Sequence, residues 1–118
     1  MFVSELAKVT ATTKDTIRHY HQLGLLIVNK RTAGTRFYYD YPSENIDRIK
    51  NIKQGKTLGF TLREIAFLLE AYYSGELSTQ RQRQILNDQL LAIEQKVQEL
   101  NNIKASIKSK LSSVTYKS

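Results

Sequence analysis

Several side chains near the N-terminus have the types and spacing needed to contact a polyanion. In segment 13–20, Thr-Lys-Asp-Thr-Ile-Arg-His-Tyr, these side chains are Lys14, Thr16, Arg18 and His19. Arginine reads a guanine edge with two hydrogen bonds or clamps a phosphate, and lysine and threonine serve backbone phosphates. An ordinary solvated basic face has the same composition, because exposed lysine and arginine are common. The residues alone therefore leave nucleic-acid contact and plain solvation both open.

A helix has to position these side chains. A Thr-x-x-Asp sequence at 12–15 is typical of a helix cap, and Gly24 is typical of a helix end, so we predict a helix over about 13–23. Its apolar residues recur three apart and are expected to face a core: Ile17, Tyr20 and Leu23. A shorter helix at about 4–10 precedes it.

The pattern then changes to that of a β-hairpin. Leu25–Val28 is a short apolar run, Asn29–Gly34 is polar and turn-like, and Arg36–Tyr41 is aromatic-rich with a two-residue alternation. We interpret these segments as first strand, turn and second strand. Two short helices followed by a hairpin wing form a DNA-binding arrangement.

Two further helices follow the hairpin. Pro42-Ser43 precedes the first, whose apolar stripe is Ile46, Ile49 and Ile52. A Thr-x-x-Glu capping box at 61–64 opens the second, which is expected to stop near Gly75.

The last helix carries the strongest periodic signal. A capping box at 79–82 opens it, and apolar residues then alternate steps of four and three. The seam comprises Leu86, Leu90, Ile93, Val97, Leu100, Lys104, Ile107, Leu111 and Val114. A helix over 79–114 is about 54 Å long at ~1.5 Å per residue, and the rest of a small domain cannot cover it. The repeat predicts a coiled coil with another chain, in which Lys104 sets the register.

At this point the chain resembles a known family. The segments that carry the resemblance are Val-Ser-Glu-Leu-Ala-Lys at 3–8, Thr-Ile-Arg-His-Tyr at 16–20, Gly-Leu-Leu at 24–26, and Leu-Gly-Phe-Thr-Leu-Arg-Glu-Ile at 58–65. In order and spacing they resemble the DNA-binding domain of the MerR family of transcription regulators. The resemblance covers about residues 2–70, and the long helix to about 114 fits the family's dimerisation helix.

The resemblance implies a mainly α fold: a winged helix-turn-helix at 1–75 and a long dimerisation helix with a short tail at 76–118. It implies a homodimer held by an antiparallel coiled coil through Leu86, Leu90, Ile93, Val97, Leu100, Lys104, Ile107 and Leu111. Such proteins bind pseudo-palindromic promoter DNA and act by bending and untwisting it, which is a form of indirect readout. RNA polymerase at the promoter is a further expected partner.

Carried over by residue, the resemblance assigns DNA contacts to Lys14, Thr16, Arg18, His19, Tyr20, Arg31 and Lys56. The wing departs from the family pattern Asn-Gly-Tyr-Arg-x-Tyr, because segment 33–41 has two extra residues, so either Arg36 or Tyr38 could occupy the contact position. Strand alternation favours both for DNA, with Phe37, Tyr39 and Tyr41 packing against the core. Ala11 stands where the family commonly has glycine, which implies a helix-helix turn that tolerates a Cβ.

Composition limits the other possibilities. The chain has a net charge of +7, and residues 1–60 carry ten basic and five acidic side chains, so the basic surface belongs mainly to the N-terminal half. No cysteine is present, which excludes disulfides and thiolate metal sites. His19 and His21, two apart on a helix, point apart and have no third ligand, so we expect no metal. No catalytic set, cofactor loop, signal peptide or membrane span stands out, and we expect a non-enzymatic cytoplasmic protein without cofactors.

The sequence leaves two other functions open. One is an architectural or excisionase-like protein that bends DNA for recombination, against which the long coiled coil argues. The other is a basic coiled-coil module that binds acidic proteins, which predicts weak DNA binding with no sequence preference. A membrane-surface role fits less well, because the basic residues do not lie opposite one wide apolar face.

Overall fold

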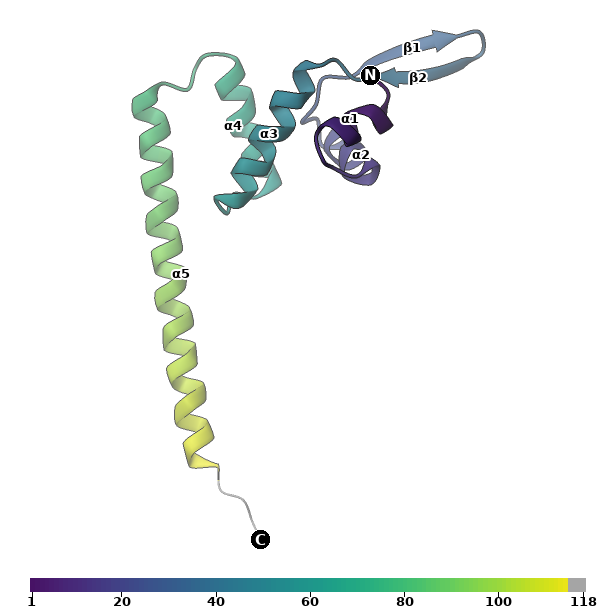
Figure 1. The fold of residues 1–118 in the computed structure, drawn as a ribbon. Coiled ribbons are helices and arrows are strands. Elements are labelled where there is room, and N and C mark those ends of the chain that lie inside the picture. Colours follow the sequence, from purple (N-terminus) through teal and green to yellow (C-terminus); the bar gives the residue numbers. More distant parts are fainter. Residues whose placement is uncertain (115–118) are drawn as a thin grey trace. The chain divides into compact units, whose positions relative to one another are not determined.

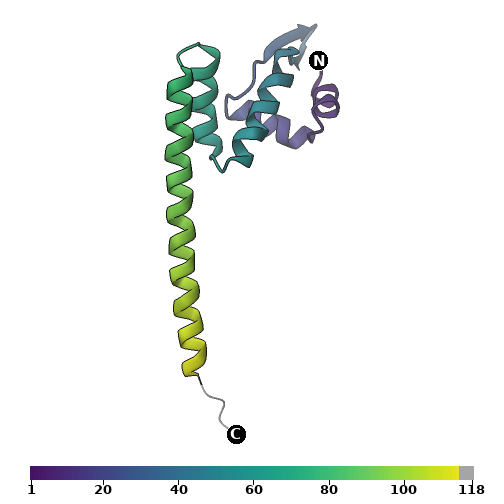
Figure 2. The same cartoon turned by 60° about the vertical axis from the view of Figure 1, so that its left-hand side comes forward.

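The computed structural model describes residues 1–114, which form five helices and one two-stranded antiparallel hairpin (Figures 1 and 2). In chain order these are α1 (Val3–Val9), α2 (Lys14–Gln22), β1 (Asn29–Ala33), β2 (Arg36–Asp40), α3 (Glu44–Thr57), α4 (Leu62–Tyr73) and α5 (Thr79–Ser113). The chain divides into two compact units, Met1–Glu76, called the head below, and the segment from Leu77 onward. The predicted fold class, a winged helix-turn-helix followed by a long helix, is confirmed.

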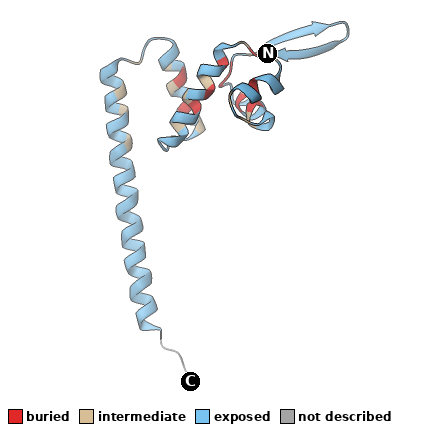
Figure 3. Cartoon of the chain, viewed as in Figure 1, coloured by how far each residue is buried: buried red, intermediate tan, exposed pale blue. Residues whose placement is uncertain are grey.

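The head has a core of its own, drawn as the buried segments of Figure 3. Its members come from α1 to α4, the loop after α2 and the end of the hairpin: Leu6, Ala7, Ile17, Tyr20, Leu25, Leu26, Tyr41, Ile49, Ile52, Ile65 and Leu69. The predicted stripe on α3 is wrong at one position, since Ile46 is 40% exposed. Leu23 is also exposed, because it is the C-terminal cap of α2 and lies beyond the last turn that packs on the core.

The first strand lies later in the chain than the apolar run predicts. Leu25 and Leu26 are buried in a loop, and β1 begins only at Asn29, within the segment that we read as a turn. The loop is held by the buried Asn45 of α3, whose amide accepts from the Ile27 N–H at 2.8 Å and donates to the Ile27 carbonyl at 2.7 Å. Asn45 thus supplies the backbone partners that a neighbouring strand would otherwise provide.

The turn between α1 and α2 is strained. Ala11 has a φ of +50°, the left-handed conformation that an L side chain adopts at a cost of about 1–2 kcal/mol. The Lys53 ammonium of α3 donates to the carbonyls of Thr10 and Ala11, so the end of α1 is tied to α3. The turn does accommodate a Cβ, as the sequence implied, but only in this conformation.

Helix α3 packs closely against α4. A Cβ added at Gly55 would lie 2.8 Å from Cγ1 of the buried Ile65, so the absence of a side chain there permits the approach. The predicted capping box opens α4: the Thr61 hydroxyl accepts from the Glu64 N–H, and the Glu64 carboxylate accepts from the Thr61 N–H.

Helix α5 is a single element of 35 residues that buries none of them (Figure 3). Its cap is the Ser78 hydroxyl, which accepts from the Arg81 N–H, one residue before the predicted capping box. The seam side chains are open to solvent: Leu90 is 56% exposed, Leu100 64% and Leu111 71%. An α-helix of this composition gains most of its stability from packing, so this seam requires a partner surface.

Candidate nucleic-acid interface

Helix α2 presents the predicted basic face. Lys14, Arg18 and His19 are exposed, and Arg18 forms an ion pair with Asp15 at 3.4 Å. Thr16 is half-buried, and its hydroxyl lies 2.8 Å from that of Thr13, the residue that caps the helix. Its hydroxyl therefore already has a partner at the helix start.

Tyr20 is a correction to the predicted set of DNA contacts. Its side chain is 2% exposed and belongs to the core, as its spacing from Ile17 indicates. A ring enclosed in the head is not available to stack on or slide along DNA, so Tyr20 positions α2 instead. The three-residue spacing of Ile17 and Tyr20 predicted this burial correctly.

The hairpin sorts its side chains onto two faces. Arg31 is paired with Tyr38 and Ala33 with Arg36, so Arg31, Arg36 and Tyr38 lie on one face. The other face holds Lys30, Phe37 and Tyr39, and the Lys30 ammonium lies 4.1 Å from the centre of the Phe37 ring. Three cation or hydroxyl groups predicted to contact DNA are therefore together on one side of the wing.

The expected packing of the opposite face is only partly correct. Tyr41 is buried, but Phe37 is 53% exposed and Tyr39 is 41% exposed. The hairpin projects from the head (Figure 1), so residues toward its tip have no core to pack against. Tyr39 instead contacts the edge of His21, with ring centres 4.7 Å apart.

Asp40 places a negative charge at the base of the basic wing face. It accepts from the α-amino group of Met1 at 2.7 Å and forms an ion pair with Arg31 at 3.6 Å. The hydrogen bond from the α-amino group, with a smaller contribution from Arg31, lowers the pKa of the Asp40 carboxyl. Asp40 therefore remains ionised, and it ties the α-amino group of Met1 and the Arg31 side chain to the base of the wing.

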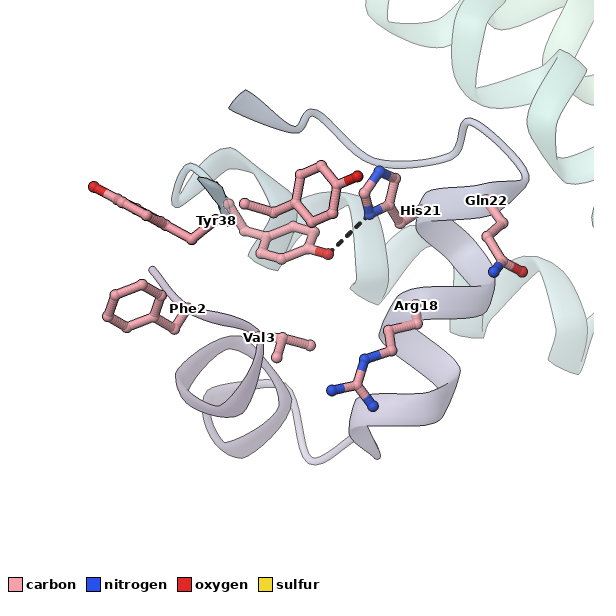
Figure 4. A pocket seen from close by; sticks show the side chains of 8 residues that line it. Phe2, Val3, Arg18, His21, Gln22 and Tyr38 are labelled. Atoms are coloured by element: carbon pink, nitrogen blue, oxygen red, sulfur yellow. Dashed lines mark hydrogen bonds between the residues drawn. The ribbon is translucent and has the colours of Figure 1, made fainter. Parts of the chain in front are cut away.

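A cavity of about 610 Å³ separates the wing base from α1 and α2 (Figure 4). Arg18 of α2 and Tyr38 of β2, both predicted to contact DNA, line the same cavity. Phe2 lines it too, 60% exposed, with its ring 5.4 Å from that of Tyr38. Residues of both predicted DNA-contacting elements, α2 and the wing, therefore line one cavity.

His21 joins α2 to the wing at the cavity wall. Its Nδ1 is hydrogen-bonded to the Tyr41 hydroxyl at 2.9 Å, and burial raises the pKa of that phenol. The sequence suggests only a possible metal ligand at His21, and it does not single out Phe2 or Lys53. The one sequence signal for His21 is its position two residues after His19, which places it on the opposite side of α2 from His19.

The remaining predicted contact is Lys56, exposed in the last turn of α3.

Within residues 1–114, no cluster of three or more histidine or acidic side chains is arranged to hold a metal ion. None of the described helices combines the length and the apolar character needed to cross a bilayer.

A helix-turn-helix with a basic recognition face and an adjoining wing defines the head of a DNA-binding transcription regulator. Two family models match the chain: "MerR HTH family regulatory protein" over residues 1–72 and "MerR, DNA binding" over residues 46–110. The chain belongs to the MerR family of DNA-binding transcription regulators, in which dimerisation and DNA bending are typical.

Individual relatives agree with this membership. The chain is 31% identical over 106 residues to the HTH-type transcriptional regulator ZntR of Escherichia coli (strain K12), covering 89% of this chain and 74% of ZntR. It is 42% identical over 67 residues to the mercuric resistance operon regulatory protein of Bacillus cereus, covering 57% of this chain and 49% of that protein. In fold it is similar to the transcription regulator PbrR691 of Ralstonia metallidurans CH34, solved in complex with lead(II). The TM-score is 0.83 at 23% identity, over 100% of this chain and 91% of PbrR691.

Proposed function

We propose that this regulator binds a pseudo-palindromic promoter site as a homodimer, with α2 of each head in the major groove and the wing against the adjoining backbone. The observation that carries the proposal is that exposed Arg18 of α2 and Tyr38 of the wing line one cavity. The two elements therefore lie next to each other, so one stretch of duplex can contact both.

Different residues have different roles in this proposal. Lys14 and Arg18 on the exposed face of α2 reach base edges and nearby phosphates. Arg31, Arg36 and Tyr38 contact the backbone beside the groove, and these contacts fix orientation without reading sequence. Lys56 neutralises a phosphate from α3, and Thr16 and His19 contribute polar contacts at the edges of α2.

The dimer sets the spacing of the two half-sites. Two heads joined by paired α5 helices bind DNA that is bent and untwisted between them, and the binding energy offsets the cost of the deformation. Because the proposed site is a promoter, we expect RNA polymerase to be the partner that responds to the deformation, in the cytoplasm. Because the chain has no cysteine, we expect the signal to be a small molecule, a protein partner or protein concentration rather than a thiolate-bound metal.

A selection of duplexes from a random pool tests the proposal directly. We expect this protein to enrich an inverted repeat. Arg18→Ala should cost about 1–3 kcal/mol and relax preference at one base pair of each half-site. Lys56→Ala should weaken binding to every sequence about equally and reduce the salt slope by about 1 per half-site.

The wing offers a matched control. Arg36→Ala should weaken binding, whereas Lys30→Ala, on the opposite hairpin face, should have little effect. Enrichment of no motif would favour the basic interaction module, and an Arg18→Ala variant with unchanged specific and nonspecific affinity would refute the assignment of α2.

A further inference from the structure

The seam of α5 contains one charged residue, Lys104. The same helix carries an acidic residue, Glu94, which a second copy of the helix could place beside it. Lys104 occupies an a position of the heptad that places Leu90, Val97 and Leu111 at the other a positions. Glu94 occupies an e position, which borders the a positions on the helix surface. In the described chain, neither Lys104 nor Glu94 forms an ion pair.

An antiparallel pair of α5 helices has a small number of possible registers. Each a residue faces a d residue of the partner, and neighbouring registers differ by one heptad, about 10 Å along the axis. We name them by what Val97 faces. It faces the partner's Leu100 in the central register, the partner's Ile93 in the inner register and the partner's Ile107 in the outer register.

Burial of the seam favours the central register. There Leu86 faces the partner's Leu111, Leu90 the partner's Ile107, and Ile93 the partner's Lys104, so the eight residues from Leu86 to Leu111 pair only with one another. The inner register leaves Ile107 and Leu111 against the partner's Arg83 and Thr79. The outer register takes Leu86 beyond the end of the partner's α5 and opposes Leu90 to Val114, which is the cap that follows the helix. Exposed apolar area is costly, so the register that pairs the eight seam residues lying within α5 is preferred.

Charge leads to the same choice. In an antiparallel pair, e positions flank e positions and g positions flank g positions. The inner register places Glu94 beside the partner's Glu94 and Lys96 beside the partner's Lys96. The outer register matches Glu94 with the partner's Lys108 but sets Lys96 beside the partner's Lys110. The central register brings no like charges together.

We propose that α5 pairs with a second copy of this chain in the central register, with Lys104 of each helix ion-paired to the partner's Glu94. The Lys104 stem stays in the seam beside the partner's Ile93, and its ammonium reaches the carboxylate one residue further along. The two ion pairs lie symmetrically about the dimer axis. This inference rests on the proposed homodimer and specifies its register.

The absence of cysteine makes crosslinking a clean test. Leu90→Cys/Ile107→Cys should form a disulfide-linked dimer, because only the central register brings these positions together. Leu90→Cys alone, Leu90→Cys/Leu100→Cys and Leu90→Cys/Val114→Cys report the parallel, inner and outer arrangements and should remain uncrosslinked. A shift of one heptad moves the two Cα atoms further apart than the roughly 7 Å that a disulfide can bridge. Crosslinking by any of these three in preference to the first variant would overturn the register.

A charge exchange provides a second readout that needs no crosslink. Glu94→Lys or Lys104→Glu should each weaken the dimer about tenfold, since each places like charges at two symmetric sites. The double variant Glu94→Lys/Lys104→Glu should recover close to wild-type dimer affinity in sedimentation. The control Glu94→Lys/Lys108→Glu recovers affinity only in the outer register.

The two proposals fail in different ways. A wild-type chain that sediments as a monomer would refute the homodimer itself. A wild-type dimer that binds its operator, but whose affinity is recovered by the Lys108 exchange and not by the Lys104 exchange, would refute only the register.

Discussion

The head and α5 achieve their structures by opposite means. The head encloses a core of eleven apolar side chains from four helices, a loop and the hairpin base, whereas α5 buries none of its 35 residues. We expect a unit with its own core to fold without another chain, and we do not expect this of a long amphipathic helix. In the proposed function, the head therefore supplies the DNA contacts and its own stability, while the number of heads on a DNA site depends on α5.

The largest expected effect comes from disrupting the seam. Leu90→Asp/Leu100→Asp should give monomers, because the variant would bury four carboxylates per dimer. Affinity for an inverted repeat should fall by about 10²–10⁴-fold, since the second head loses its effective concentration. Sedimentation and DNA titration measure both changes. The head should keep its cooperative thermal transition, and its loss together with the dimer would show that the two units are not independent.

A smaller effect is expected inside the head. Asn45→Ala should lower the free energy of unfolding by about 2–5 kcal/mol, because the N–H and C=O of Ile27 lose their buried partners. Denaturant titration reads the change. Asn51→Ala provides a comparison, because Asn51 contacts the Tyr73 hydroxyl near the surface. Its cost should be below about 1 kcal/mol, and equal losses would contradict the role assigned to Asn45.

The smallest expected effect is a change in stability that has opposite signs in the head and in α5. Ala11→Gly should stabilise the head by about 0.5–1 kcal/mol, because glycine adopts the left-handed conformation without a Cβ clash. Ala105→Gly makes the same chemical change in the exposed middle of α5 and should destabilise the helix by about 0.5–1 kcal/mol. Thermal unfolding of both variants checks the pair. A destabilised Ala11→Gly would mean that the turn is not strained.

Local signals predicted the framework well. The capping box at Thr61 and the stop at Gly24 depend on neighbours in sequence, so they appear in the structure at the expected places. The period of the α5 seam is likewise a local property, and the spacing of Ile17 and Tyr20 correctly indicated a buried side.

The features that the sequence did not predict depend on contacts between residues far apart in the chain. Leu25 and Leu26 have the composition of a strand, but the core formed by α1 to α4 takes them as a buried loop. Phe37 alternates correctly with Tyr39, yet no core lies beneath it. The hydrogen bond between His21 and Tyr41 joins residues twenty positions apart, and no helix or strand periodicity predicts that contact.

A helix without internal burial has a consequence for gene dosage. For a regulator that reads its operator as the proposed dimer, the DNA-competent species below the dimer dissociation constant rises with the square of the protomer concentration. Doubling synthesis of the chain then raises that species about fourfold. The exposed seam on α5 would therefore sharpen a gradual change in expression into a steeper response at the promoter.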